Sequence, residues 1–210
     1  MLKYDWLPAS STLHAVGSST SISSISGLRR GELDFRDVTL QAIADFNTQL
    51  DAALEGLTPE QWRWRPTPTA NHILWTVWHL TRVEDGWINW YLSDNGERWK
   101  VNGWAEKFGL PARDRWGVGD TPEQVGAFPD VPANVVEGYR ADVMESAYPV
   151  IRGFSATDLE RTNADHNPFQ PRPAPTFTWV LARISVECSQ HIGQVAYIRG
   201  LMPEQDNWQE

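Results

Sequence analysis

The stretch FTWVLARISVECSQHIGQVAYIRG, residues 177–200, decides the fold. Its apolar residues recur every three to four positions, which is the period of an α-helix that packs one face on a core. We expect one helix from about Thr176 to Gly200. Seven of its side chains would fall within about a third of the helix circumference. This core-facing stripe consists of Phe177, Leu181, Ile184, Cys188, His191, Val195 and Ile198.

Two polar residues of this helix are spaced for joint chemistry: His191 lies in the stripe and Glu187 lies at its edge. Residues four apart on a helix have Cβ atoms about 5–6 Å apart, so the two side chains could bind one metal ion. A carboxylate beside apolar surface is costly unless its charge is neutralised. A metal ion would neutralise it, and so would Arg183 or Arg199 of the same helix. The spacing leaves both interpretations open.

A second helix is expected over NHILWTVWHLTRVEDGWINWYL, residues 71–92, from Thr69 or Asn71 to about Ser93. It carries two neighbouring apolar stripes, which indicates that it packs on two sides. His79 lies on the second stripe and is the candidate third ligand. His72 is two turns away, about 10.5 Å, which is too far for the same ion. We interpret His72 as a helix cap or a surface residue.

Two further long helices complete the pattern, from about Glu32 to Leu54 and from about Ala133 to Phe154. The first should turn its Val38 side inward. Four long helices with long connections and no strand pattern predict an all-α four-helix bundle. We expect residues 1–30 to form an irregular N-terminal arm and residues 31–210 to form one bundle domain.

The connections contain short helices and caps. Thr58-Pro59-Glu60-Gln61 and the matching letters at 121–124 each predict a capping box, and Thr157 to Glu160 offers another. The irregular segment from Asp94 to Val131 is a candidate lid over one end of the bundle. Short helices are expected within it at 104–108 and 122–127.

Composition excludes several classes of function. The net charge of −9 argues against nucleic-acid and anionic-membrane surfaces, which need basic patches. Cys188 is the single cysteine, so no internal disulfide forms. We find no signal-peptide run, no transmembrane run and no phosphate-binding glycine loop, and we expect a cytoplasmic protein.

Two segments of this chain, WHLTRVEDGW at 78–87 and ECSQHIGQVAYIRGL at 187–201, resemble the signature regions of the DinB/YfiT-like superfamily. That superfamily includes mycothiol-dependent maleylpyruvate isomerase and bacillithiol transferases. Its first metal ligand is a His of the second helix, which matches His79. Its other two ligands are a pair four apart on the fourth helix, the second in an H-x-G-Q segment, which matches His191. Glu187 stands where the commonest pattern has a His.

The resemblance implies a four-helix bundle that binds a divalent ion (Zn, Ni or Fe) through His79, Glu187 and His191. It implies an S-transferase or isomerase that uses mycothiol or bacillithiol as co-substrate and acts on a small electrophile, and it implies a homodimer. A less specific interpretation of the same site is a metal-dependent hydrolase. The non-enzymatic alternative is a bundle that binds a metal or a small ligand. No catalytic acid or base is assigned.

Other candidate residues have plainer interpretations. Cys188 is expected to be a small buried side chain. Glu84 is expected to be structural, and His166 to be an exposed loop residue unless it leans over the metal. Several tryptophans belong either to the core or to the lining of a substrate pocket. They are Trp62, Trp64, Trp99, Trp104 and Trp116.

Overall fold

The computed structural model describes residues 33–112 and 116–203, and the account below concerns the unit that begins at Asp34. Over these ranges the chain is helical, with only an isolated bridge between Thr162 and Thr176 in place of any strand. The predicted all-α fold is confirmed. In the described part of the chain, no helix combines the length and apolarity needed to cross a bilayer. The arm predicted at residues 1–30 lies outside the described residues.

Four long helices form the bundle, and short helices connect them. The long ones are α1 (Phe35–Leu54), α3 (Ile73–Asp85), α7 (Ala133–Gly153) and α8 (Phe177–Leu201). The short ones are α2 (Pro59–Arg63), the π-helix η2 (Gly86–Tyr91), α4 (Arg98–Val101), α5 (Trp104–Lys107), α6 (Pro122–Gly126) and the 3₁₀-helix η3 (Ala156–Glu160).

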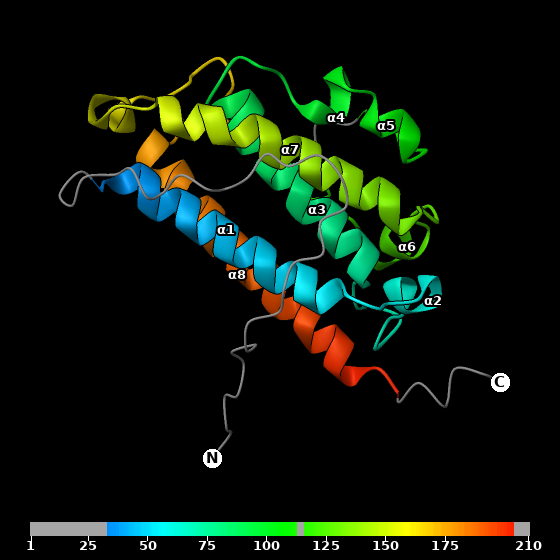
Figure 1. Cartoon of the computed structure of the whole chain (residues 1–210). Coiled ribbons are helices and arrows are strands. Elements are labelled where there is room, and N and C mark those ends of the chain that lie inside the picture. The colour runs from blue at the N-terminus through cyan, green and yellow to red at the C-terminus, as the bar shows by residue number, and fades with distance from the viewer. Residues whose placement is uncertain (1–32, 113–115, 204–210) are drawn as a thin grey trace. The chain divides into compact units, whose positions relative to one another are not determined.

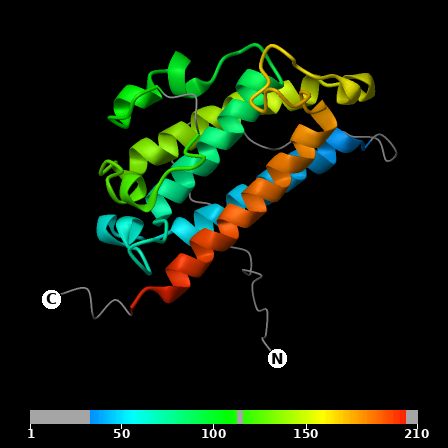
Figure 2. The same ribbon diagram turned by 180° about the vertical axis from the view of Figure 1, so that it is seen from behind.

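The long helices pack as a ring in the order α1, α8, α3, α7. Figures 1 and 2 show α1 beside α8 and α3 beside α7, and α8 also packs on α3. Every residue of α3 is buried, which confirms that this helix packs on more than one side. Its last turn continues directly into η2, so the second predicted helix is in fact two elements. A π-helical turn is uncommon and often occurs beside functional sites.

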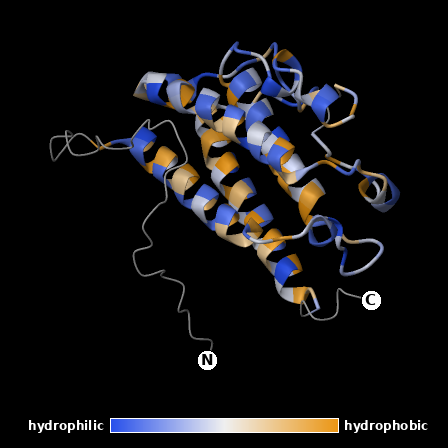
Figure 3. Ribbon diagram, turned by 45° about the vertical axis from the view of Figure 1, so that its right-hand side comes forward, coloured by the Kyte–Doolittle hydropathy of each residue, from blue (hydrophilic) through white to orange (hydrophobic). Residues whose placement is uncertain are grey.

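Hydrophobic and hydrophilic positions alternate around each long helix (Figure 3). The stripe predicted on α8 is buried, except that His191 is partly exposed. The face predicted for α1 is wrong in one respect, because Val38 is 71% exposed. The residues that α1 buries are spaced three or four apart, and the first of them lies two residues after Val38, on the opposite side of the helix. They are Leu40, Ile43, Phe46, Leu50 and Leu54.

Side-chain caps fix several helix ends. The capping boxes at Thr58 and Thr121 are confirmed, and each is followed by a proline in the first turn. Thr176 caps α8 by accepting a hydrogen bond from the backbone N–H of Trp179. The box predicted to begin at Thr157 begins instead at Ser155, because the carboxylate of Asp158 accepts the backbone N–H of Ser155.

Candidate metal centre

The two predicted helices bring three side chains together where α3 packs on α8. His79 comes from the middle of α3, and Glu187 and His191 come from successive turns of α8. One ligand atom of each residue lies within 4.8 Å of those of the others. Glu187 Oε1 lies 3.0 Å from His191 Nε2 and 3.7 Å from His79 Nε2. Both imidazoles therefore direct Nε2 toward Oε1 of Glu187.

His79 is held by a backbone carbonyl. Its Nδ1–H donates to the carbonyl oxygen of Trp116, which belongs to the segment between α5 and α6. A carbonyl oxygen can only accept, so the proton of the neutral ring sits on Nδ1 and the lone pair on Nε2. The ring of Trp75 stacks on the other side of this imidazole, with centroids 4.9 Å apart and planes 9° apart. These two contacts fix which nitrogen of His79 faces Glu187.

A residue of its own helix orients His191 in the same way, through Nδ1. Its Nδ1 lies 3.0 Å from the amide oxygen of Gln194, one turn further along α8. Nδ1–H again donates, which leaves the lone pair of Nε2 directed at the centre. Orientation of a ligand histidine through its second nitrogen is the usual arrangement at metal sites.

Glu187 divides its two oxygens between two kinds of partner. Arg183, one turn earlier on α8, pairs with Oε2, while Oε1 faces the two imidazoles. His191 first, then His79, and also Arg183 favour the ionised form of Glu187 and hold its pKa far below its usual range. The carboxylate is thus ionised, and its Oε1 is an anionic oxygen that faces both imidazoles. Arg199, the other cation considered from sequence, donates instead to the carbonyls of Ala52 and Ala53.

The donor set fits a divalent cation. Two imidazole nitrogens and one carboxylate oxygen are ligands that Zn²⁺, Ni²⁺ and Fe²⁺ accept. With the Nδ1 protons assigned as above, two nitrogen lone pairs and an anionic oxygen converge on one point. Such an arrangement is repulsive unless a proton or a cation lies between these atoms. The three side chains are at most 13% exposed, so water screens this repulsion poorly.

A buried network holds the carbonyl that orients His79. The indole N–H of Trp116 donates to Glu97 Oε1 at 2.8 Å, and Arg82 donates to the same oxygen at 3.1 Å. The Trp116 ring covers Gly86 so closely that a Cβ there would lie 2.1 Å from it. Gly117 has φ of +85° and leaves no room for a side chain beside His79 and Trp78. The covering segment is therefore fixed by packing on α3.

A second buried group, Asp85, anchors the elements around this network. Its carboxylate accepts the backbone N–H groups of Arg98 and Trp99 and the hydroxyl of Tyr139. These bonds link the end of α3 to α4 and α7. Asp85 is thus a buried structural residue that holds several elements together.

The other candidate residues lie outside the triad. His72 caps α3 and is buried rather than at the surface, with its Nε2 3.0 Å from the carbonyl of Val125. Burial lowers the pKa of His72 to about 4, so the ring is neutral. His166 packs on Trp90 in the loop before α8. Cys188 is buried, and burial raises the pKa of its thiol well above the usual value.

Sequence reasoning missed the support given by Trp116 and Glu97. A main-chain carbonyl leaves no mark in the residue pattern, so this contact could not be predicted. One usable signal was the Trp-Gly pair at 116–117, since a glycine with positive φ indicates close approach of the backbone to something else.

Comparison with known proteins agrees with this fold. A family model described as the DinB superfamily matches residues 43–195, a range that contains His79, Glu187 and His191. A crystal structure described as the conserved protein of locus from Enterococcus faecalis has a TM-score of 0.70 and 20% identity, over 80% of this chain and 97% of that chain. This identity shows likeness of fold alone. Among curated proteins, none matches the chain. Because the family model spans most of the bundle, the chain belongs to the DinB superfamily.

Proposed function

We propose that His79, Glu187 and His191 together bind one divalent metal ion and that the protein is a metal-dependent enzyme. The observation that carries this proposal is the convergence of two Nε2 atoms and an ionised carboxylate oxygen from two helices. Trp116, Gln194 and Arg183 hold the three ligands in that orientation. Zn, Ni or Fe would suit this set. Such an ion, when bound by three protein ligands, supplies a Lewis acid that lowers the pKa of a bound thiol or water.

The reaction we propose is transfer or isomerisation that depends on a low-molecular-weight thiol, mycothiol or bacillithiol. The thiol sulfur would form a bond to an electrophilic carbon of a small substrate, and the leaving group and the thiol proton would depart. The likeness of the signature segments to those of thiol-dependent relatives supports this choice. A reducing cytoplasm, where such thiols stay reduced, is the proposed location.

An aromatic surface beside the triad supports a substrate with a planar apolar body. Trp87 of η2 and Trp179 of α8 lie eight residues from His79 and Glu187, about 12 Å along the helical direction. Their rings, together with Phe169, have centroids 5.6–5.8 Å apart. Phe169 is 37% and Trp179 43% exposed, so this surface can be reached from solvent.

We also propose a homodimer that pairs through α1 and α8. Along α8, which the structure describes in full, the exposed positions are apolar, small or uncharged polar, apart from Arg199. Val186 is 47% and Tyr197 68% exposed. A groove of about 350 Å³ between α1 and α8 is lined by small residues such as Ser189, Gly193 and Ala196. Interface cores are poor in charge and rich in aromatic residues, which favours a second copy as the partner.

Metal analysis of the purified protein tests the binding site. We expect about one divalent ion per chain in the wild type, and loss of it in His79→Ala and His191→Ala without loss of helicity. His166→Ala is the matched control, because that histidine lies in a loop outside the triad, and it should retain the ion. Equal metal content in all four proteins would contradict the proposal.

Turnover separates an enzyme from a binding protein. The metal-loaded protein would be incubated with mycothiol or bacillithiol and a chlorinated dinitroaromatic electrophile, and the thioether product measured. We expect product formation that is lost in His191→Ala. Metal binding without any turnover across thiols and electrophiles would favour the non-catalytic alternative.

A further inference from the structure

A second cavity lies on the other side of the bundle, between α1 and α7. Its volume is about 880 Å³. Its walls come from the second half of α1, the turn that follows it, Trp62 of α2 and the first half of α7. No described residue of α3 or α8 lines it, so it is separate from the candidate metal centre. The volume is within the range of small-molecule sites.

Arg140 of α7 reaches across this cavity toward α1 with part of its guanidinium unused. Its Nη2 forms an ion pair with Asp51 Oδ1 at 2.8 Å and donates to Asn47 Oδ1 at 3.1 Å. The remaining N–H groups of Arg140 have no hydrogen-bond partner among the described residues. The side chain is only 12% exposed, although Asp51 is 66% exposed. Because both hydrogens of Nη2 are used, the Nη1 group is left to donate a charge-assisted hydrogen bond to an anion such as a carboxylate.

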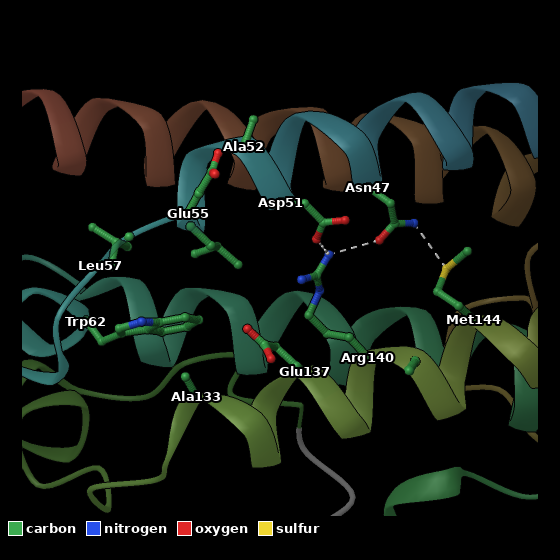
Figure 4. Close-up of a pocket in the computed structure, with 13 residues that line it drawn as sticks. Asn47, Asp51, Ala52, Glu55, Leu57, Trp62, Ala133, Glu137, Arg140 and Met144 are labelled. Carbon is green, nitrogen blue, oxygen red and sulfur yellow. Dashed lines mark hydrogen bonds and ion pairs between the residues drawn. The ribbon is translucent and has the colours of Figure 1, made fainter. Parts of the chain in front are cut away.

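Two carboxylates face the same cavity without a cation of their own. Glu137 lies one turn before Arg140 on α7, and Glu55 lies at the end of α1 (Figure 4). Within the described ranges neither side chain forms an ion pair. The carboxylates of Glu137 and Glu55 would repel a simple anion. A simple cation would leave the Nη1 group of Arg140 without an acceptor. A ligand with both charges satisfies both sets of groups.

The rest of the lining is apolar. Trp62 is 5% exposed and presents its indole to the cavity beside Leu57 (Figure 4). Leu54 also lines the cavity, and Met144 lies at its far end against Asn47. An aromatic and aliphatic surface of this kind binds an apolar side chain by excluding water. It lies beside the charged groups of Figure 4, so one small ligand could contact both.

We propose that this cavity binds a free α-amino acid with an apolar side chain. The ligand carboxylate pairs with Arg140, its ammonium with Glu137, and its side chain packs on Trp62. Residues three apart on a helix are surface neighbours, so Glu137 and Arg140 present opposite charges at the short separation that an α-amino acid requires. The inference does not depend on the metal centre.

Calorimetric titration of the full chain tests the charge requirement. The probes are L-phenylalanine, phenethylamine, which lacks the carboxylate, and 3-phenylpropionate, which lacks the ammonium. We expect L-phenylalanine to bind and each analogue to bind about tenfold more weakly or worse, because each leaves charged groups of the cavity unpaired. Failure of L-phenylalanine to bind, or equal affinity for all three probes, would overturn the proposal.

Variants then place the binding in this cavity. Arg140→Gln and Glu137→Gln should each weaken L-phenylalanine binding by about tenfold or more. Glu145→Gln, on an exposed position of the same helix outside the cavity, should bind as the wild type does. Glu137 is exposed, so Glu137→Gln should fold. This variant therefore tests the location of the binding site even if Arg140→Gln fails to fold. Wild-type affinity in Glu137→Gln, or in a folded Arg140→Gln, would refute the assignment, and metal content should be unchanged in both.

Discussion

Gly86 and Trp116 show how little space surrounds the groups that orient His79. A Cβ on Gly86 would lie 2.1 Å from the Trp116 ring, and the carbonyl of Trp116 accepts the Nδ1 proton of His79. Movement of this ring would displace the carbonyl as well. The orientation of His79 therefore depends on the absence of a side chain at Gly86 of η2.

Gly86→Ala is therefore expected to destabilise the fold by about 1–3 kcal/mol, the usual cost of overpacking a close contact. Thermal or urea unfolding measures this. Gly153→Ala, at the end of α7, is the control, since a Cβ there meets nothing within 4 Å and the helix should gain up to about 1 kcal/mol. Equal stability of the two variants would show that Trp116 does not pack on Gly86 in solution.

Glu84 gives a pH dependence of stability. Burial raises its pKa from 4.5 to about 8, while Arg140 and the bond to Cys188 oppose the shift and Asp85 adds to it. Between these two values the folded chain keeps a proton that the unfolded chain loses. The free energy of unfolding therefore falls as pH rises through this window.

Glu84→Gln removes this titration and should become progressively more stable than the wild type from pH 5 to pH 8. Denaturant unfolding of both proteins at several pH values measures the difference, which cancels the contribution of His72. Parallel stability curves would mean that Glu84 is already ionised in the folded protein.

The ligand types and their spacing could be read from the sequence, because Glu187 and His191 share one helix. The supporting groups could not. Trp116 acts through its main chain, and Glu97 acts through Trp116, so both depend on how the segment between α5 and α6 folds back onto α3.

At the scale of the helices, the side chain of Asp85 holds the end of α3 against its neighbours. Asp85 accepts bonds from two backbone N–H groups at the start of α4 and from Tyr139 of α7. Burial raises the pKa of Asp85, and those bonds oppose the shift. Removal of the carboxylate would leave these donors without their acceptor in a buried site.

Asp85→Ala should destabilise the protein by about 3 kcal/mol or more, since it leaves several buried partners uncompensated. Glu145→Ala, at an exposed position of α7, should change stability by less than about 0.5 kcal/mol. Chemical denaturation gives both values. A small loss for Asp85→Ala would mean that α4 is not anchored by this carboxylate.

The ends of a helix could be predicted where its capping residue and the spacing of its apolar residues indicate the same range. Thr176 and the apolar stripe placed α8 within about a residue of its observed ends. On α1 the apolar residues occur on more than one face, so Val38 could be assigned inward although it is exposed. The change from α3 to η2 has no sequence signal that we recognised.

For the chain as a whole, the proposed dimer gives a direct prediction. Val186→Glu places a charge on the exposed face of α8 and should convert a dimer to a monomer. Val101→Glu, at an exposed valine of α4, should leave the mass unchanged. Light scattering after size-exclusion chromatography measures the mass. A monomeric wild type would contradict the proposed dimer.

The bundle and its family could be predicted because four long amphipathic segments and two signature segments span most of the chain. The cavity between α1 and α7 could not, since it depends on how far apart those two helices pack.

The central claim is that His79 and His191, from different helices, bind the same ion. X-ray absorption at the metal edge of the loaded protein tests it most directly, because imidazole rings give a distinct multiple-scattering pattern. The account predicts the pattern of two imidazoles and oxygen ligands, reduced to one imidazole or lost in His79→Ala. A spectrum without imidazole scattering, or one that His79→Ala leaves unchanged, would contradict it.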